Sequence, residues 1–147
     1  MSCIFCAIAS GSAPASRVYS DERCVAFMDI HPLSEGHVLV IPVQHAMQIT
    51  ELATDLSLHL FAVAQRVLKA QRDLGFGIQG SHVLLNDGKA ANQKVPHVHI
   101  HVIPRKHGDA LGSIGRLILH VTGIFGRAKA RKTLEAQALQ LRQALER

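Results

Sequence analysis

Apolar side chains recur along the chain with a helical spacing in three places. Between residues 51 and 74, leucines and valines return every three or four positions, and Gly75 ends the pattern. This spacing predicts one long amphipathic helix. The same spacing over residues 128–145 predicts a C-terminal helix, and a short apolar turn over residues 4–8 is expected to end at Gly11.

Five further segments are rich in Val, Ile and aromatic residues and are bounded by turn-forming residues, which is typical of strands. Runs of strands interrupted by single helices predict an α+β domain with a five-stranded, mostly antiparallel sheet, one long central helix and a C-terminal helix. The first three strands are expected to form an antiparallel meander. With 147 residues, 48% of them hydrophobic, residues 1–147 are expected to form a single domain. The predicted strands are Arg17–Ser20, 25–30, 37–42, Ser81–Leu85 and 96–104.

The net charge of +5 arises entirely from the C-terminal part of the chain. Residues 113–147 hold seven Lys or Arg against two Glu, whereas residues 1–112 hold nine of each sign. Few aromatic residues are present to stack on bases, so a nucleic-acid partner is not expected. The first residues lack a basic flank and a long apolar run, and no stretch approaches the ~20 residues of a membrane span. We therefore expect a cytoplasmic protein without membrane contact.

Three histidines alternate with apolar residues in the segment His-Val-His-Ile-His at positions 97–101. On a strand, this alternation places the three imidazoles on one side, about 6.5–7 Å apart, and the apolar side chains on the core side. Protonating all three imidazoles at once is then disfavoured, and the neutral ring is the nucleophilic form. The pattern leaves two interpretations open, a metal site and covalent catalysis by a histidine.

Three cysteines cannot all pair within one chain, and two of them, Cys3 and Cys6, form a C-x-x-C motif. Metal binding or free thiols are expected rather than a disulfide. A redox C-x-x-C normally follows a strand, and no strand is predicted before Cys3. Cys24 is expected to be a small buried hydrophobic residue.

The histidine segment is part of a wider resemblance to the histidine triad (HIT) family of nucleotide-binding proteins, in particular to its small zinc-bearing, Hint-like hydrolases. The stretches CIFCAIASGSAPASRVYSDERCVAFMDIHP, GHVLVIPVQH and LNDGKAANQKVPHVHIHVIPR resemble the family in order and spacing. Together they cover most of residues 3–105. The resemblance implies a HIT-like fold, a homodimer, and a divergent basic extension over residues 106–147.

The resemblance also implies that the protein cleaves the bond between the α-phosphate of a purine nucleotide and its substituent, as in adenosine 5′-phosphoramidate. His99 would attack the α-phosphorus and form a nucleotidyl-histidine that water hydrolyses. His101 would hold phosphate oxygens and Gln93 the scissile oxygen. Asp29 would accept hydrogen bonds from the ribose hydroxyls. Further implied catalytic positions are His37 and Lys94, and further nucleotide-binding positions are Ile4, Phe5, Ile8, Phe27, Ile30 and Asn86.

A structural zinc and no organic cofactor are implied by the same resemblance. Its ligands would be Cys3, Cys6, His45 and His97, an S2N2 set of the kind that zinc prefers. The ion would attach the N-terminal segment to the sheet and hold His97 next to the nucleophile.

Two residues depart from the family pattern Ala-Gly-Gln-Ser/Thr-Val before the triad. Asn92 replaces a glycine for which a positive φ is expected, and asparagine tolerates that conformation best among the other residues. Lys94 replaces a hydroxyl that helps to protonate the leaving group. Because an ammonium is longer and charged, we expect Lys94 to favour more anionic leaving groups.

Three alternative functions remain open at this point. The family also includes diadenosine polyphosphate hydrolases, which the triad does not distinguish from phosphoramidases. A nucleotide-binding regulatory protein with little turnover could contact an acidic partner through residues 127–132, although such a charge run is usually solvated. A zinc-dependent hydrolase would use all three triad histidines as ligands.

Overall fold

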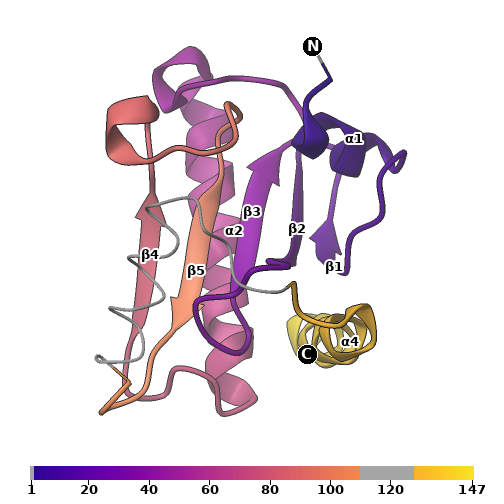
Figure 1. Cartoon of the computed structure of the whole chain (residues 1–147), viewed down its shortest axis with the longest axis vertical. Helices are drawn as coiled ribbons and strands as arrows, with labels where there is room; N and C mark the ends of the chain where they lie inside the picture. Colours follow the sequence, from indigo (N-terminus) through magenta and orange to yellow (C-terminus); the bar gives the residue numbers. More distant parts are fainter. Residues whose placement is uncertain (1, 110–127) are drawn as a thin grey trace.

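The computed structural model describes residues 2–109 and 128–147. Residues 110–127, which include Arg116 and Arg127 of the predicted basic extension, lie outside the described part. The five strands form one antiparallel sheet in the order β1-β2-β3-β5-β4, so the predicted α+β class is confirmed (Figure 1). The elements are α1 (Ile4–Ser10), β1 (Arg17–Ser20), β2 (Cys24–Met28), β3 (Val38–Pro42), the 3-10 turn η1 (Ile49–Glu51), α2 (Thr54–Asp73), β4 (Ser81–Leu85), the 3-10 turn η2 (Lys89–Ala91), β5 (Ile100–Pro104) and α4 (Arg131–Leu145).

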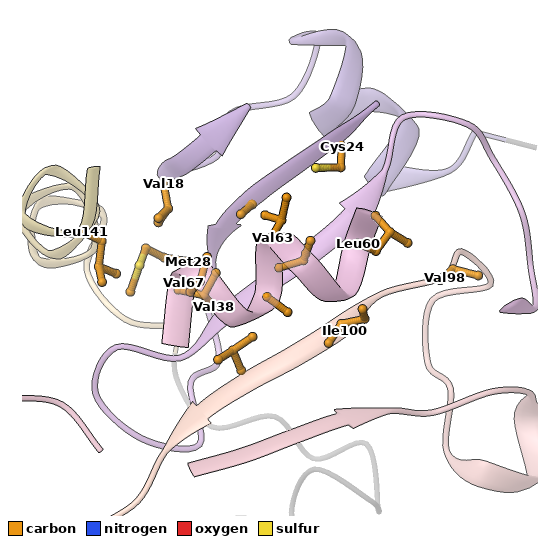
Figure 2. Close-up of a cluster of buried hydrophobic side chains, with 14 of the residues drawn as sticks. Val18, Cys24, Met28, Val38, Leu60, Val63, Val67, Val98, Ile100 and Leu141 are labelled. Carbon is orange, nitrogen blue, oxygen red and sulfur yellow. The ribbon is translucent and has the colours of Figure 1, made fainter. Parts of the chain in front are cut away.

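Helices cover both faces of the sheet, and for this reason all residues of the central strands β2, β3 and β5 are buried. Side chains from α2 and α4 pack on one face, where Leu60, Val63 and Val67 meet the strands and Leu141 lies near Met28 (Figure 2). The opposite face packs against α1 in a smaller cluster around Phe5 and Phe27, among others. Successive strand residues face opposite sides, so β2 and β3 contribute to both clusters.

The helices agree with the hydrophobic spacing. Helix α1 ends at Gly11, whose φ of 84° is the left-handed conformation that glycine adopts readily at a helix end. Helix α2 begins three residues later than predicted because residues 49–51 form the separate turn η1, in which the Leu52 amide bonds to the Ile49 carbonyl. None of the helices in residues 2–109 and 128–147 has the length and apolar character needed to cross a bilayer.

The predicted extent of the last strand is wrong at its N-terminal end, because β5 begins at Ile100 rather than at residue 96. The amide of His97 bonds to the Val95 carbonyl at 2.8 Å, and the amide of Val98 bonds to the Ala46 carbonyl at 2.8 Å. These amides are used outside the strand ladder. His101 therefore lies on a strand, whereas His97 and His99 lie in the irregular segment before it.

Candidate active site and metal centre

A pocket of about 430 Å³ opens on the α1 face of the sheet, a size suited to a small ligand. Its apolar wall includes Ile4, Phe5 and Ile8 of α1 and Phe27 of β2. The polar part includes Asp29, Asn86, Lys94, His99 and His101. An apolar recess bordered by hydrogen-bonding groups can hold a flat ring together with a polar, anionic group.

His99 is held in a defined tautomer at the polar end of this pocket. Its Nδ1 lies 2.7 Å from the carbonyl oxygen of His97. Because a carbonyl only accepts hydrogen bonds, Nδ1 carries the proton and the lone pair is on Nε2. The ring is 6% exposed and packs edge-on against Phe5 at 5.2 Å between centroids. Burial of this kind keeps the imidazole oriented.

A chain of hydrogen bonds sets the tautomer of His101 in the same way. The amide of Leu33 donates to Nδ1 of His37, so the proton of a neutral His37 is on Nε2. That Nε2 lies 3.0 Å from Nδ1 of His101, which therefore accepts, and the proton of His101 is placed on its Nε2. Asp29 Oδ2 lies 3.5 Å from Nε2 of His37. The result is a proton donor on the ring next to His99, whose centroid is 4.9 Å away.

The loop between β4 and β5 supplies the remaining polar residues. Asn92 has φ 62° and ψ 29°, so the prediction of a positive φ at this position is confirmed. The Gln93 amide bonds to the backbone on both sides, accepting from Gly88 N–H at 2.7 Å and donating to the Met47 carbonyl at 2.6 Å. Gln93 thus braces the loop and is not among the pocket-lining residues, whereas its neighbours Asn92 and Lys94 are.

The residues proposed as metal ligands converge at one point beside the pocket. Nδ1 of His97 lies 3.4 Å from Cys3 Sγ, 3.6 Å from Cys6 Sγ and 3.2 Å from Nδ1 of His45. Cys6 Sγ is 3.3 Å from the His45 nitrogen. The edges of a tetrahedron built from zinc–nitrogen and zinc–sulfur bonds are about 3.3–3.8 Å long. These four atoms therefore have the spacing of a four-coordinate metal site.

The hydrogen bonds and electrostatics of the cluster agree with this role. Nε2 of His97 lies 2.9 Å from the Pro42 carbonyl, so Nδ1 is unprotonated and directed at the cysteines. Burial lowers the pKa of His97, the Pro42 carbonyl opposes this, and His45 and His99 add to the lowering. Burial and the adjacent Cys3 raise the pKa of the Cys6 thiol. Bound zinc would reverse the effect on the thiol because it stabilises the thiolate.

The three triad histidines are separated by this arrangement. Both nitrogens of His97 face the cysteine cluster and the Pro42 carbonyl, while His99 and His101 face the pocket. A single ion held by all three rings is therefore not compatible with the geometry.

The three cysteines are free thiols, and Cys24 is completely buried, as predicted.

The pocket brings together most of the nucleotide-binding residues predicted from the sequence, but it also contains residues that were missed. His37 lies outside the lining and contacts the lining residues His101 and Asp29. Ile30 is 45% exposed at the rim. The basic residue Arg131, predicted as part of a solvated charge run, lines the pocket from α4. The other missed lining residues are Pro14, Ala15, Met28, His31, Leu39, Asn92 and Val95.

Comparison with known proteins defines the class to which this fold and site belong. Residues 10–108 match the model of the HIT domain. An uncharacterized HIT-like protein of Mycobacterium tuberculosis is 41% identical over 111 residues, which are 76% of each chain. The chain therefore belongs to the HIT family, which includes nucleotide-binding proteins and hydrolases.

Two further relatives bear on the site. The adenosine 5′-monophosphoramidase hnt1 of Schizosaccharomyces pombe is 40% identical over 109 residues, covering 74% of this chain and 78% of its own. The crystal structure of a Zn-bound histidine triad family protein from Mycobacterium smegmatis superimposes with a TM-score of 0.78 at 38% identity. That match covers 99% of this chain and 94% of the other.

Proposed function

We propose that the protein hydrolyses purine nucleotides that carry a substituent on the α-phosphate, for example adenosine 5′-phosphoramidate, and that His99 is the nucleophile. The observation that carries the proposal is the bond of His99 Nδ1 to the His97 carbonyl, which leaves the lone pair on Nε2 at the polar end of a nucleotide-sized pocket. The similarity to a phosphoramidase adds support.

The reaction follows from these groups in two steps. In the first step, Nε2 of His99 forms a bond to the α-phosphorus while the bond to the substituent breaks, and the leaving amine takes up a proton from solvent. In the second step, water attacks the phosphorus and gives up a proton to solvent, the bond to Nε2 breaks, and the nucleoside monophosphate is released. The Nε2–H of His101 donates to the phosphate oxygens on which negative charge collects.

The remaining pocket residues bind the nucleotide and the leaving group. Ile4, Phe5, Ile8 and Phe27 are proposed to hold the base, with the half-exposed Ile30 at the rim. Asp29 accepts hydrogen bonds from the ribose hydroxyls, a role that two carboxylate oxygens can fill. Asn86 and Lys94 lie in the pocket where they can contact the phosphate and the leaving group. Gln93 acts as a positioning residue through the loop it braces.

We further propose that Cys3, Cys6, His45 and His97 hold one structural zinc ion. The ion would supply no reaction chemistry, only a fixed link between the N-terminal segment and the segments at residues 45 and 97. The support is the tetrahedral spacing of the four donor atoms and the Zn-bound relative. The His97 side chain is in this cluster while its backbone oxygen holds His99, so the cluster orients the nucleophile.

The quaternary and domain organisation are part of the proposal. Leu58 and Phe61 of α2 are 66% and 45% exposed, and Met47 is 52% exposed. A homodimer would cover apolar side chains of this kind, and sedimentation at several concentrations tests it. We propose a single domain, because Leu134, Ala138 and Leu141 of α4 belong to the same core cluster as α2 and the sheet.

Turnover of adenosine 5′-phosphoramidate and of a dinucleoside polyphosphate, measured side by side, tests the function. His99→Ala should abolish hydrolysis while nucleotide binding persists. The matched variant His107→Ala, which removes an exposed histidine that does not line the pocket, should keep wild-type turnover. Preferred hydrolysis of the polyphosphate would instead favour a diadenosine polyphosphate hydrolase. Binding of both compounds without turnover by the wild type would identify a nucleotide-binding regulator and overturn the proposed reaction.

A further inference from the structure

Arg131 brings a positive charge from α4 to the pocket. The pocket lies on the α1 face of the sheet, whereas the core residues of α4 pack with α2 on the other face. Arg131 is the first residue of α4, and it lines the pocket together with Pro14, Ala15, Ile30 and His31. The chain just before it is held against the loop after β2, because the Lys129 amide donates to the Ile30 carbonyl at 2.9 Å. The placement of Arg131 is therefore set by tertiary contacts.

The guanidinium is also oriented through a buried hydroxyl. Nη1 of Arg131 donates to Oγ of Ser16 at 3.3 Å, and that hydroxyl donates to Oε1 of Glu135 at 2.7 Å. Ser16 is 1% exposed, so this acceptor is fixed. Within residues 2–109 and 128–147, Arg131 forms no ion pair with a carboxylate. Arg131 is linked to Glu135 through the Ser16 hydroxyl, and its other N–H groups can donate to a ligand in the pocket that Arg131 lines.

The position of Arg131 corresponds to the base end of the proposed nucleotide. With the α-phosphate at His99 and His101 and the ribose at Asp29, the base extends into the apolar recess between α1 and Phe27. Pro14 and Ala15 also line the pocket and directly precede Ser16, to which Arg131 is bonded. The apolar walls contact the faces of the base, so its polar edge is the part left for a hydrogen-bonding group.

The chemistry of arginine selects among bases at this edge. A guanidinium has only N–H donors, arranged as a planar fork. Guanine and hypoxanthine present two neighbouring acceptors, O6 and N7, whereas adenine presents the N7 acceptor beside an N6 amino donor. The guanidinium fork can donate to both acceptors of guanine or hypoxanthine. At adenine, one of its N–H groups would face the N6 amino group, which is also a donor.

We propose that Arg131 reads the O6/N7 edge of the base and gives this protein a preference for 6-oxopurine nucleotides over adenine nucleotides. The proposal rests on the proposed function, because it takes the pocket to be the nucleotide site. Arg131 is a specificity-determining residue in this assignment and takes no part in the reaction at phosphorus.

Calorimetric titration of the full chain with GMP, IMP and AMP tests the assignment without requiring turnover. The wild type should bind GMP and IMP about tenfold or more tighter than AMP, as expected for a bidentate contact. Arg131→Ala should bind the three nucleotides with similar affinity. Arg131→Gln should favour AMP, because an amide offers both an acceptor and a donor to the adenine edge.

Lys132→Ala provides the matched control, since it removes one charge from the exposed neighbour on the same helix and should keep the wild-type order of affinities. Equal binding of the three nucleotides by the wild type, or a preference that survives in both Arg131 variants, would overturn the inference while leaving the proposed function intact. Failure of the wild type to bind any of the three would overturn the proposed function and the inference with it. Thermal unfolding of each variant verifies that it is folded.

Discussion

The backbone oxygen of His97 fixes His99 at 2.7 Å, while the His97 side chain belongs to the Cys/His cluster. One residue thus connects the proposed metal centre to the proposed nucleophile. Substitution of a metal ligand should therefore lower the rate of the reaction even though no metal ligand touches the substrate. This link distinguishes a zinc site that only stabilises the fold from one that also orients His99.

Loss of a metal ligand should lower both zinc content and turnover. For Cys6→Ser and His45→Ala we expect less than one zinc per chain by elemental analysis and a kcat reduced about tenfold, because outer contacts of a reactive group commonly have effects of this size. The KM for the nucleotide should change less than kcat. Cys24→Ala, which removes a thiol outside the cluster, should keep full zinc content, and a zinc-replete Cys6→Ser protein would refute the assigned ligand set.

Lys94→Ser should change the preference among leaving groups. The Lys94 side chain lines the pocket, and removal of its charge should lower kcat/KM for anionic leaving groups relative to uncharged amines. An exposed charge interaction of about 1 kcal/mol corresponds to a relative change of about fivefold. Lys89→Ser, which removes an exposed lysine from the same loop, serves as the control. Identical relative kcat/KM values across a leaving-group series would refute this role for Lys94.

Substitutions at Asn92 should separate backbone conformation from side-chain chemistry. The residue has φ 62°, so Asn92→Ala should lower the free energy of unfolding by about 1 kcal/mol because alanine is disfavoured in the left-handed region. Asn92→Gly should retain stability to within about 0.5 kcal/mol, since glycine adopts this conformation readily. Chemical denaturation measures both effects. If the alanine variant proved as stable as the glycine variant, backbone conformation would not be the constraint at this position.

Asp21 should make the stability of the fold pH-dependent. Burial alone would raise its pKa, but hydrogen bonds from Tyr19, from two backbone amides and from His59 outweigh burial and lower the pKa below its usual 3.8. A lowered pKa means that this stabilisation is present above about pH 4 and is lost as the pH falls further. Asp21→Asn should cost about 1–3 kcal/mol near neutrality.

The difference in unfolding free energy between wild type and Asp21→Asn should shrink as the pH is lowered from 5 to 2, measured by denaturant titration at each pH. Asp55→Asn is the matched control, because Asp55 pairs with Arg23 at 2.7 Å but its side chain is 76% exposed. Exposed pairs of this kind contribute about 0–1 kcal/mol. A pH-independent difference for Asp21→Asn would contradict the assigned cause.

The helices, the chain reversal at Gly11 and the positive φ at Asn92 were predictable because they depend on neighbouring residues. Helical spacing marks which side chains share a face, and only Gly and, less readily, Asn adopt a left-handed conformation at low cost. The alternation of apolar residues around the triad likewise placed Val98 and Ile100 in the core. The family resemblance, which is also a property of the sequence, implied the set of metal ligands and the reactive histidine.

Only the tertiary structure decided where distant polar groups meet. Pairing of β3 with β5 brings His37 to His101, which is 64 residues away. The bond from the Val98 amide to the Ala46 carbonyl delays the start of β5 to Ile100, and the His97 side chain before it lies at the cysteines. Packing of α4 against α2 and β1 carries Arg131 to the pocket, although its local sequence is that of an ordinary basic helix start. Local sequence determines backbone preference, whereas contacts between residues far apart depend on how the whole core packs.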